Sequence, residues 1–150
     1  MTTKIYIPRD SSAIGLGADM VADQVSRVSE SMNQDVEVVR NGSRGLIWME
    51  PLLEVETESG RTGFANVNTT DVEGLVKSNF IEAGLRAKSV GLVDEIPYLK
   101  NQERLCFARN GITDPTSIED YIENAGFDGL SSALELDARS IVDIVTESGL

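Results

Sequence analysis

The hydrophobic pattern of the first 80 residues changes period several times. Alternating polar and apolar positions predict strands at residues 4–7, 35–39 and 52–57 and a weaker strand at 62–67. A turn signal between the last two predicts an antiparallel hairpin. Between the first two strands the pattern changes to helical spacing and runs to about Met32, with apolar residues at Ala18, Val21, Val25, Val28 and Met32.

A second helix is predicted after the hairpin. Residues 70–73 (TDVE) have the form of a capping box, in which a hydroxyl and a carboxylate satisfy the first backbone N–H groups. This helix buries Val72, Leu75, Val76 and Phe80 and stops at Gly84. A strand, a helix, three strands and a helix in that order predict an α/β sandwich of thioredoxin-like type over residues 1–84.

The remaining residues predict a mostly helical segment. Residues 85–96 show no convincing period and are interpreted as a linker, and residues 97–110 as a short strand or an extended arm. The Asp114-Pro115 pair predicts a cap and a first helical residue. That helix ends at Gly126, and a shorter one follows near residues 130–136.

A last helix is predicted from Asp137, its N-cap, to Gly149. Its apolar residues Ile141, Val142 and Val145 are expected to be buried. The predicted organisation is therefore a domain at 1–84, a linker at 85–96 and a segment at 97–150.

Composition excludes several classes of function. With 13 Lys+Arg against 25 Asp+Glu, the net charge of −12 argues against nucleic acid and anionic membrane surfaces as partners. No apolar run is long enough for a membrane span and no signal peptide is recognisable, so we expect a cytoplasmic protein. One cysteine and no histidine exclude a cysteine-based zinc or iron–sulfur site and histidine-dependent catalysis within these residues.

The loop at residues 40–51 is the main candidate for function. It lies between two predicted strands, and its glycines tolerate a positive φ. Two interpretations are open, a tight turn plugged by Trp48 and a contact surface. Arg40 and Arg44 could bind an anion, but pairing with the many carboxylates of this chain is favoured.

Other candidates have weaker support. Gly15 and Gly17 resemble a dinucleotide fingerprint but lack its third glycine, so a plain helix start is favoured. Two pairs of carboxylates are interpreted as solvated faces, and Cys106 as a small apolar filler. The pairs are Glu54 with Glu56 and Glu119 with Asp120. From the residues alone we assign no catalytic, cofactor-binding or metal-binding residue.

Two stretches carry a family resemblance. Residues 97–104 (PYLKNQER), 110–121 (NGITDPTSIEDY), 126–127 (GF) and 147–150 (ESGL) resemble the start of the NADH-binding flavoprotein subunit of complex I and its relatives. The relatives include the diaphorase subunit of NAD-reducing hydrogenases and the β subunit of NAD-dependent, molybdenum-containing formate dehydrogenases. The resemblance implies a longer parent subunit with FMN, NAD and a [4Fe–4S] cluster bound beyond Leu150, and no cofactor residue within these 150.

Residues 1–84 resemble a thioredoxin-like ferredoxin domain fused ahead of that flavoprotein. Ferredoxins of this type hold a [2Fe–2S] cluster on four cysteines, and this resemblance places the ligand positions at Pro8, Ala13, Ser43 and Ile47. None of the four is a cysteine, which implies a domain that has kept the fold and lost the metal.

The fusion, together with residues 40–56, most resembles the formate dehydrogenase β subunit. It implies a structural role in a complex that passes electrons from formate through iron–sulfur clusters and FMN to NAD. The implied partners are a molybdenum- and iron–sulfur-containing α subunit and a small [2Fe–2S] thioredoxin-like subunit. The alternatives are the same piece of a complex I or hydrogenase diaphorase subunit, and an autonomous thioredoxin-like binding module.

Overall fold

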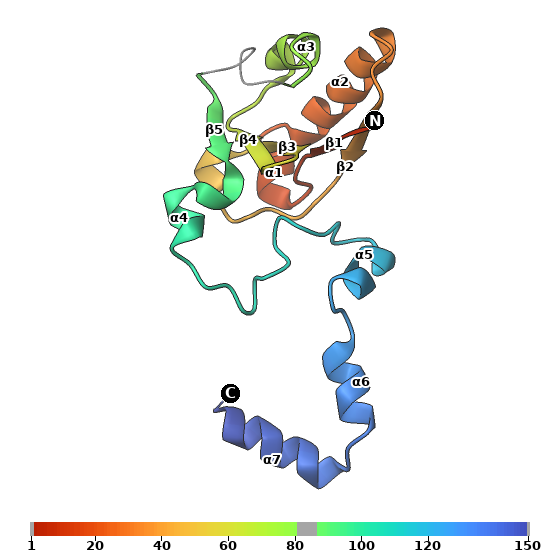
Figure 1. Ribbon diagram of the computed structural model, residues 1–150, viewed down its shortest axis with the longest axis vertical. Coiled ribbons are helices and arrows are strands. Elements are labelled where there is room, and N and C mark those ends of the chain that lie inside the picture. The colour runs from red at the N-terminus through yellow and green to blue at the C-terminus, as the bar shows by residue number, and fades with distance from the viewer. Residues whose placement is uncertain (1, 81–86, 150) are drawn as a thin grey trace. The chain divides into compact units, whose positions relative to one another are not determined.

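The computed structural model describes residues 2–80 and 87–149, which fall into two compact units, Met1–Asp114 and Pro115–Leu150. The first unit contains a sheet with helices, and the second contains helices alone (Figure 1). The domain boundaries expected near residues 84 and 96 remain a prediction.

The sheet of the first unit has five strands in the order β2-β1-β3-β4-β5. The predicted antiparallel hairpin is confirmed, since β3 pairs with β4 with Thr57 opposite Gly60, and β1 and β2 are parallel. β3 is also antiparallel to β1, and β5 to β4. The strands are β1 (Thr3–Tyr6), β2 (Val36–Val39), β3 (Leu53–Thr57), β4 (Gly60–Phe64) and β5 (Ser89–Leu92).

Helices close one face of this sheet with apolar side chains. The short α1 (Ser11–Gly15) precedes α2 (Ala18–Ser31), and α3 (Thr69–Lys77) lies beside α2 (Figure 1). The capping box of α3 consists of Asn68 and Asp71, so the predicted one at residues 70–73 is wrong by two residues. The predicted burial is confirmed, since one buried cluster contains Val21, Val25, Val72, Leu75, Val76 and Phe80 packed with Ile5, Leu53, Val55 and Phe64. α3 ends at Lys77, however, before Phe80, and the end expected at Gly84 lies outside the described residues.

The opposite face is covered by short helices and coil. Here lie the 3-10 turns η1 (Ile47–Met49) and η3 (Val93–Glu95) and the helix α4 (Pro97–Lys100). A second buried cluster consists of Leu46, Leu52, Ala65, Val93, Ile96 and Leu99. The described part of the expected linker, residues 87–96, therefore holds a sheet strand and core residues, and the strand or arm expected at 97–110 begins instead as a helix.

The second unit contains α5 (Ile118–Glu123), α6 (Asp128–Leu134) and α7 (Ala138–Ser148). Asp137 caps α7 as predicted, whereas Ser117, not Asp114, caps α5. Val142 and Val145 are 56% and 49% exposed, so their expected burial does not occur within this unit. Among residues 2–80 and 87–149, no helix combines the length and apolarity that crossing a bilayer requires.

Candidate functional site

The loop that follows β2 is tied to the end of β1 by Arg40. Its Nε donates to the carbonyl of Ile7 at 3.1 Å, and its Nη2 donates to the carbonyl of Pro8 at 3.1 Å. Nη2 also pairs with Asp19 of α2 at 2.6 Å. Arg40 therefore has a structural role, and its ion pair with Asp19 confirms the favoured interpretation of charge pairing.

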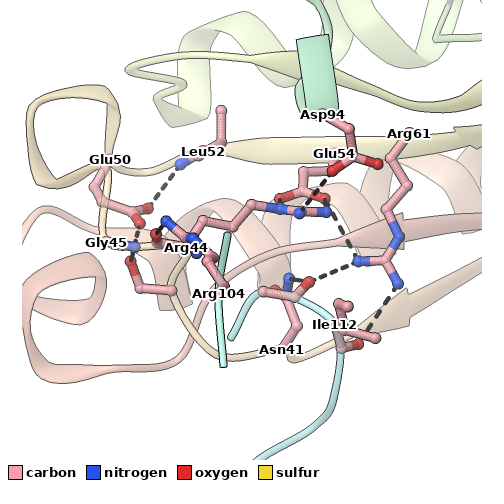
Figure 2. A network of polar contacts seen from close by, with 12 residues as sticks. Asn41, Arg44, Gly45, Glu50, Leu52, Glu54, Arg61, Asp94, Arg104 and Ile112 are labelled. Atoms are coloured by element: carbon pink, nitrogen blue, oxygen red, sulfur yellow. Dashed lines mark hydrogen bonds and ion pairs between the residues drawn. The ribbon is translucent and has the colours of Figure 1, made fainter. Parts of the chain in front are cut away.

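Arg44, on the same loop, forms a buried ion pair with Glu54 of β3 (Figure 2). Two parallel bonds join them, Nε to Oε1 at 2.7 Å and Nη2 to Oε2 at 2.9 Å. Glu54 is completely buried and Arg44 is 8% exposed. The expected solvated face of Glu54 is therefore wrong, although the exposure expected for its neighbour Glu56 is confirmed.

Two further charges complete this centre. Asp94 accepts from Arg44 Nη1 at 3.1 Å, and Arg61 Nη1 lies 3.5 Å from Glu54 Oε2. Burial alone lowers the pKa of Arg44, but the hydrogen bonds and charge of Glu54, with those of Asp94, outweigh burial and raise this pKa above its ordinary value. The pair is held by complementary geometry, as a desolvated ion pair requires.

A run of turns at residues 104–113, here called the strap, covers the buried centre. The carbonyl of Gly111 accepts from Arg61 Nη1 at 2.7 Å and from Asn41 Nδ2 at 2.8 Å. The backbone N–H of Gly42 donates to the Thr113 carbonyl at 3.0 Å. At the other end of the strap, Arg104 donates to the Arg44 carbonyl at 2.9 Å (Figure 2). The centre therefore fastens the strap to the sheet.

Glu50 is a second buried carboxylate of the loop, at 3% exposed. It accepts from the Ser43 hydroxyl at 2.8 Å and from the Leu52 backbone N–H at 2.8 Å. Burial raises the pKa of Glu50, these two bonds oppose the rise, and the charges of Asp10 and Glu54 add to it. Both carboxylate oxygens accept hydrogen bonds from donors within the loop, so Glu50 stabilises the conformation of the loop.

Trp48 does not plug the loop. It is 56% exposed and meets Tyr98 of α4 edge to face, with 5.2 Å between the ring centroids. Beside Tyr98 lies a surface groove of about 360 Å³, also lined by Gly45, Gln102, Arg104, Phe107 and Asn110. Cys106, expected to be a buried filler, is exposed on the strap.

The four positions expected to correspond to cluster ligands do not fit a [2Fe–2S] cluster. Pro8 and Ala13 are buried, the Ser43 hydroxyl donates to Glu50, and Ile47 is 58% exposed. Iron in these clusters is bound by thiolates, which none of the four residues supplies. In the described ranges, no group of three or more His, Cys, Asp or Glu is placed to hold a metal ion.

The remaining candidates take structural positions. Gly17, with φ of 100°, precedes α2, and α1 separates it from β1, so the strand–glycine–helix corner of a dinucleotide site is not formed. Glu119 and Asp120 lie in the first turn of α5, where acids suit the helix dipole. Sequence reasoning missed Arg61 and Arg104 and the hydrogen bond from Asn41 to Gly111, because no periodic pattern marks a residue whose partner is a distant coil.

Comparison with known proteins finds similarity both in sequence and in structure. No protein-family profile matches the sequence. Over 51 residues the chain is 41% identical to NADP-reducing hydrogenase subunit HndC of Solidesulfovibrio fructosivorans. This match covers 34% of the chain and spans about a tenth (10%) of that relative's length.

The structure is similar to a thioredoxin-like [2Fe–2S] ferredoxin from Aquifex aeolicus. The TM-score is 0.51 at 12% identity, over 60% of this chain and 91% of the ferredoxin. A second structure, of the wild-type thioredoxin-like [2Fe–2S] ferredoxin from that organism, gives a TM-score of 0.49 at 11% identity. The match covers 60% of this chain and 97% of the ferredoxin. The first of these matches confirms the predicted fold class: the chain has a mixed α/β fold like that of a thioredoxin-like ferredoxin.

Proposed function

We propose that this chain is the N-terminal structural part of the NADH-binding flavoprotein subunit of an NAD-dependent formate dehydrogenase. The parent complex would pass electrons from formate through iron–sulfur clusters and FMN to NAD. Its partners would be a molybdenum- and iron–sulfur-containing subunit and a small [2Fe–2S] thioredoxin-like subunit, in the cytoplasm. The hydrogenase relative and the resemblance of residues 97–150 support an NAD(P)-linked redox complex as the setting.

The observation that carries this proposal is a ferredoxin-type fold without thiols where a cluster would need them. Pro8, Ala13, Ser43 and Ile47 supply no thiolate, so the domain would act as a spacer and docking body without an electron carrier. The strap is the part of the structure that supports this docking role. It binds the residues that follow α4 to the sheet through Gly111 and Arg44, so these residues would form part of the docking body.

Metal analysis of the purified chain tests the clusterless domain. We expect no stoichiometric iron and no visible absorption after anaerobic reconstitution with iron and sulfide. A matched variant carries P8C, A13C, S43C and I47C together, and iron uptake by this variant alone would support the assignment of those positions. A stoichiometric [2Fe–2S] spectrum from the unmodified chain would contradict the proposal.

A hydrogenase is the second candidate parent, favoured by the 41% identity with NADP-reducing hydrogenase subunit HndC. The chain's sheet and strap would serve the same structural purpose there. Affinity purification of the tagged protein from its own cells separates the two candidates. A molybdenum-containing partner supports formate dehydrogenase, whereas a hydrogenase subunit supports the alternative.

A further inference from the structure

The groove beside the strap is cationic in a strongly acidic chain. Tyr98, Gln102, Arg104, Phe107 and Asn110 line it together with Arg44 and Gly45, and no Asp or Glu is among these lining residues. A second hollow of about 330 Å³ shares Arg44, Arg104 and Asn110 with it and is also lined by Asp94 and Lys100, so the absence of carboxylates holds for the first groove alone. Carboxylates outnumber lysines and arginines by 25 to 13 in this chain, so a groove without one is a local exception.

Arg104 is the cation that this groove presents. Its Nε donates to Gln102 Oε1 at 3.0 Å and its Nη2 donates to the Arg44 carbonyl at 2.9 Å, and both acceptors are neutral. Within residues 2–80 and 87–149 it forms no ion pair, unlike Arg40, Arg44 and Arg61. A guanidinium has five N–H donors, so Arg104 is held in place and keeps donors for a further acceptor.

The rim of the groove is apolar and exposed. Trp48, Tyr98 and Phe107 are 56%, 50% and 65% exposed. Trp48 touches Tyr98, and Tyr98 and Phe107 line the same groove. Tryptophan, tyrosine and arginine are the residues that most often dominate binding energy at protein interfaces, and exposed aromatic patches mark such interfaces.

We propose that this groove is a docking site for an acidic segment of a partner protein. An Asp or Glu carboxylate of the segment pairs with Arg104, and an adjacent apolar side chain packs on Tyr98 and Phe107. The charge of the groove selects a carboxylate, and the aromatic rim selects a peptide over a free anion. The chain's net charge of −12 repels an acidic segment only weakly at this groove, because salt screens exposed charges beyond about 8 Å in physiological conditions.

The test is a selection from a random peptide library displayed on phage, with this 150-residue chain as bait. We expect enriched peptides to carry Asp or Glu beside an aliphatic or aromatic residue. Their binding is then measured through the fluorescence of Trp48, the only tryptophan, which lies on the rim. R104Q should weaken binding about tenfold or more, because it removes a charge-assisted hydrogen bond.

Matched variants separate docking from loss of structure. R27Q removes the same charge from an exposed position on α2 and should leave affinity unchanged, whereas R104K should restore part of what R104Q loses. F107A keeps Arg104 and should also weaken binding. If R104Q unfolds, the affinity of F107A for the peptide therefore tests whether the groove is the docking site.

Three results would overturn the proposal. They are enrichment without carboxylates, equal binding of peptides in which Asn and Gln replace Asp and Glu, and a Trp48 response to inorganic phosphate or acetate but to no peptide. The last result would indicate a small-anion site in place of a docking surface.

Discussion

On one face of the sheet α2 and α3 exclude water with aliphatic side chains, whereas on the other a strap of successive turns covers a buried carboxylate. β3 serves both faces: Leu53 and Val55 pack under the helices, and Leu52 and Glu54 point the opposite way. The helical face tolerates many arrangements of similar volume, because apolar contact has no direction. The polar face requires specific partners, because an unpaired buried charge is very costly.

The largest effect is expected from E54Q, which removes the carboxylate charge but keeps the shape of the side chain. Arg44 and Arg61 would then lack their buried counter-charge, so we expect a loss of about 3–5 kcal/mol in the free energy of unfolding. Urea denaturation followed by Trp48 fluorescence measures it. E56Q, at an exposed position of the same strand, should shift stability by less than about 0.5 kcal/mol. Equal losses in the two variants would contradict the distinction between the faces.

G111A should come next. Gly111 has φ of +82°, and an added Cβ would lie 2.2 Å from Arg44 Cγ. We expect a loss of about 3 kcal/mol, part from the left-handed backbone and part from the clash. G45A is the matched control, because Gly45 has φ of +84° with no atom within 4 Å of the added Cβ. G45A should therefore lose only about 1–2 kcal/mol, and a loss as large as that of G111A would argue against close packing of the strap on Arg44.

V25A tests the helical face. It removes two methyl groups from a fully buried side chain of α2, so we expect a loss of about 2 kcal/mol. Limited trypsin digestion then sharpens the comparison. E54Q and G111A should release the strap and speed cleavage at Arg104 or Arg109 under native conditions, whereas V25A should not. Faster strap cleavage in V25A would mean that the two faces are energetically coupled.

The smallest effect concerns Glu50 and pH. Because burial raises the pKa of Glu50, the folded state binds its proton more tightly than the unfolded state. The unmodified chain should therefore lose stability relative to E50Q as pH rises from the ordinary glutamate pKa through the raised one. Urea denaturation of both proteins across that range measures the difference. A difference that is constant with pH, or that grows in the opposite direction, would contradict the raised pKa.

The sheet and its two main helices were predictable because their residues repeat. Alternation at residues 52–57 and helical spacing from Ala18 to Met32 reflect burial against one neighbouring layer, and both elements are confirmed. β5 escaped prediction because Ser89–Leu92, a short edge strand containing Gly91, has no alternating pattern. The predicted cap of α3 is two residues late, because Asn68 and Asp71 form the same reciprocal hydrogen bonds as the Thr-to-Glu capping box expected at residues 70–73.

The candidate site was predictable only in part. The loop at 40–51 and the pairing of its arginines followed from glycines, charge and composition. The burial of Glu54 did not, because alternation tells which side of a strand a residue lies on and not whether a distant segment covers that side. Arg104 and Gly111 are 50 or more residues from Arg44 and Glu54, and no local pattern joins them.

The sequence by itself determined strands β1 to β4, the amphipathic helices and the absence of thiolates at the four expected ligand positions, because periodicity, composition and ligand chemistry are properties of the chain. Only the tertiary structure decided that Glu54 is buried, that Trp48 is exposed and that Arg104 faces a groove without carboxylates. These depend on which surfaces the coil after α4 covers, and that choice is made by a few long-range hydrogen bonds to Gly111, Thr113 and Arg44.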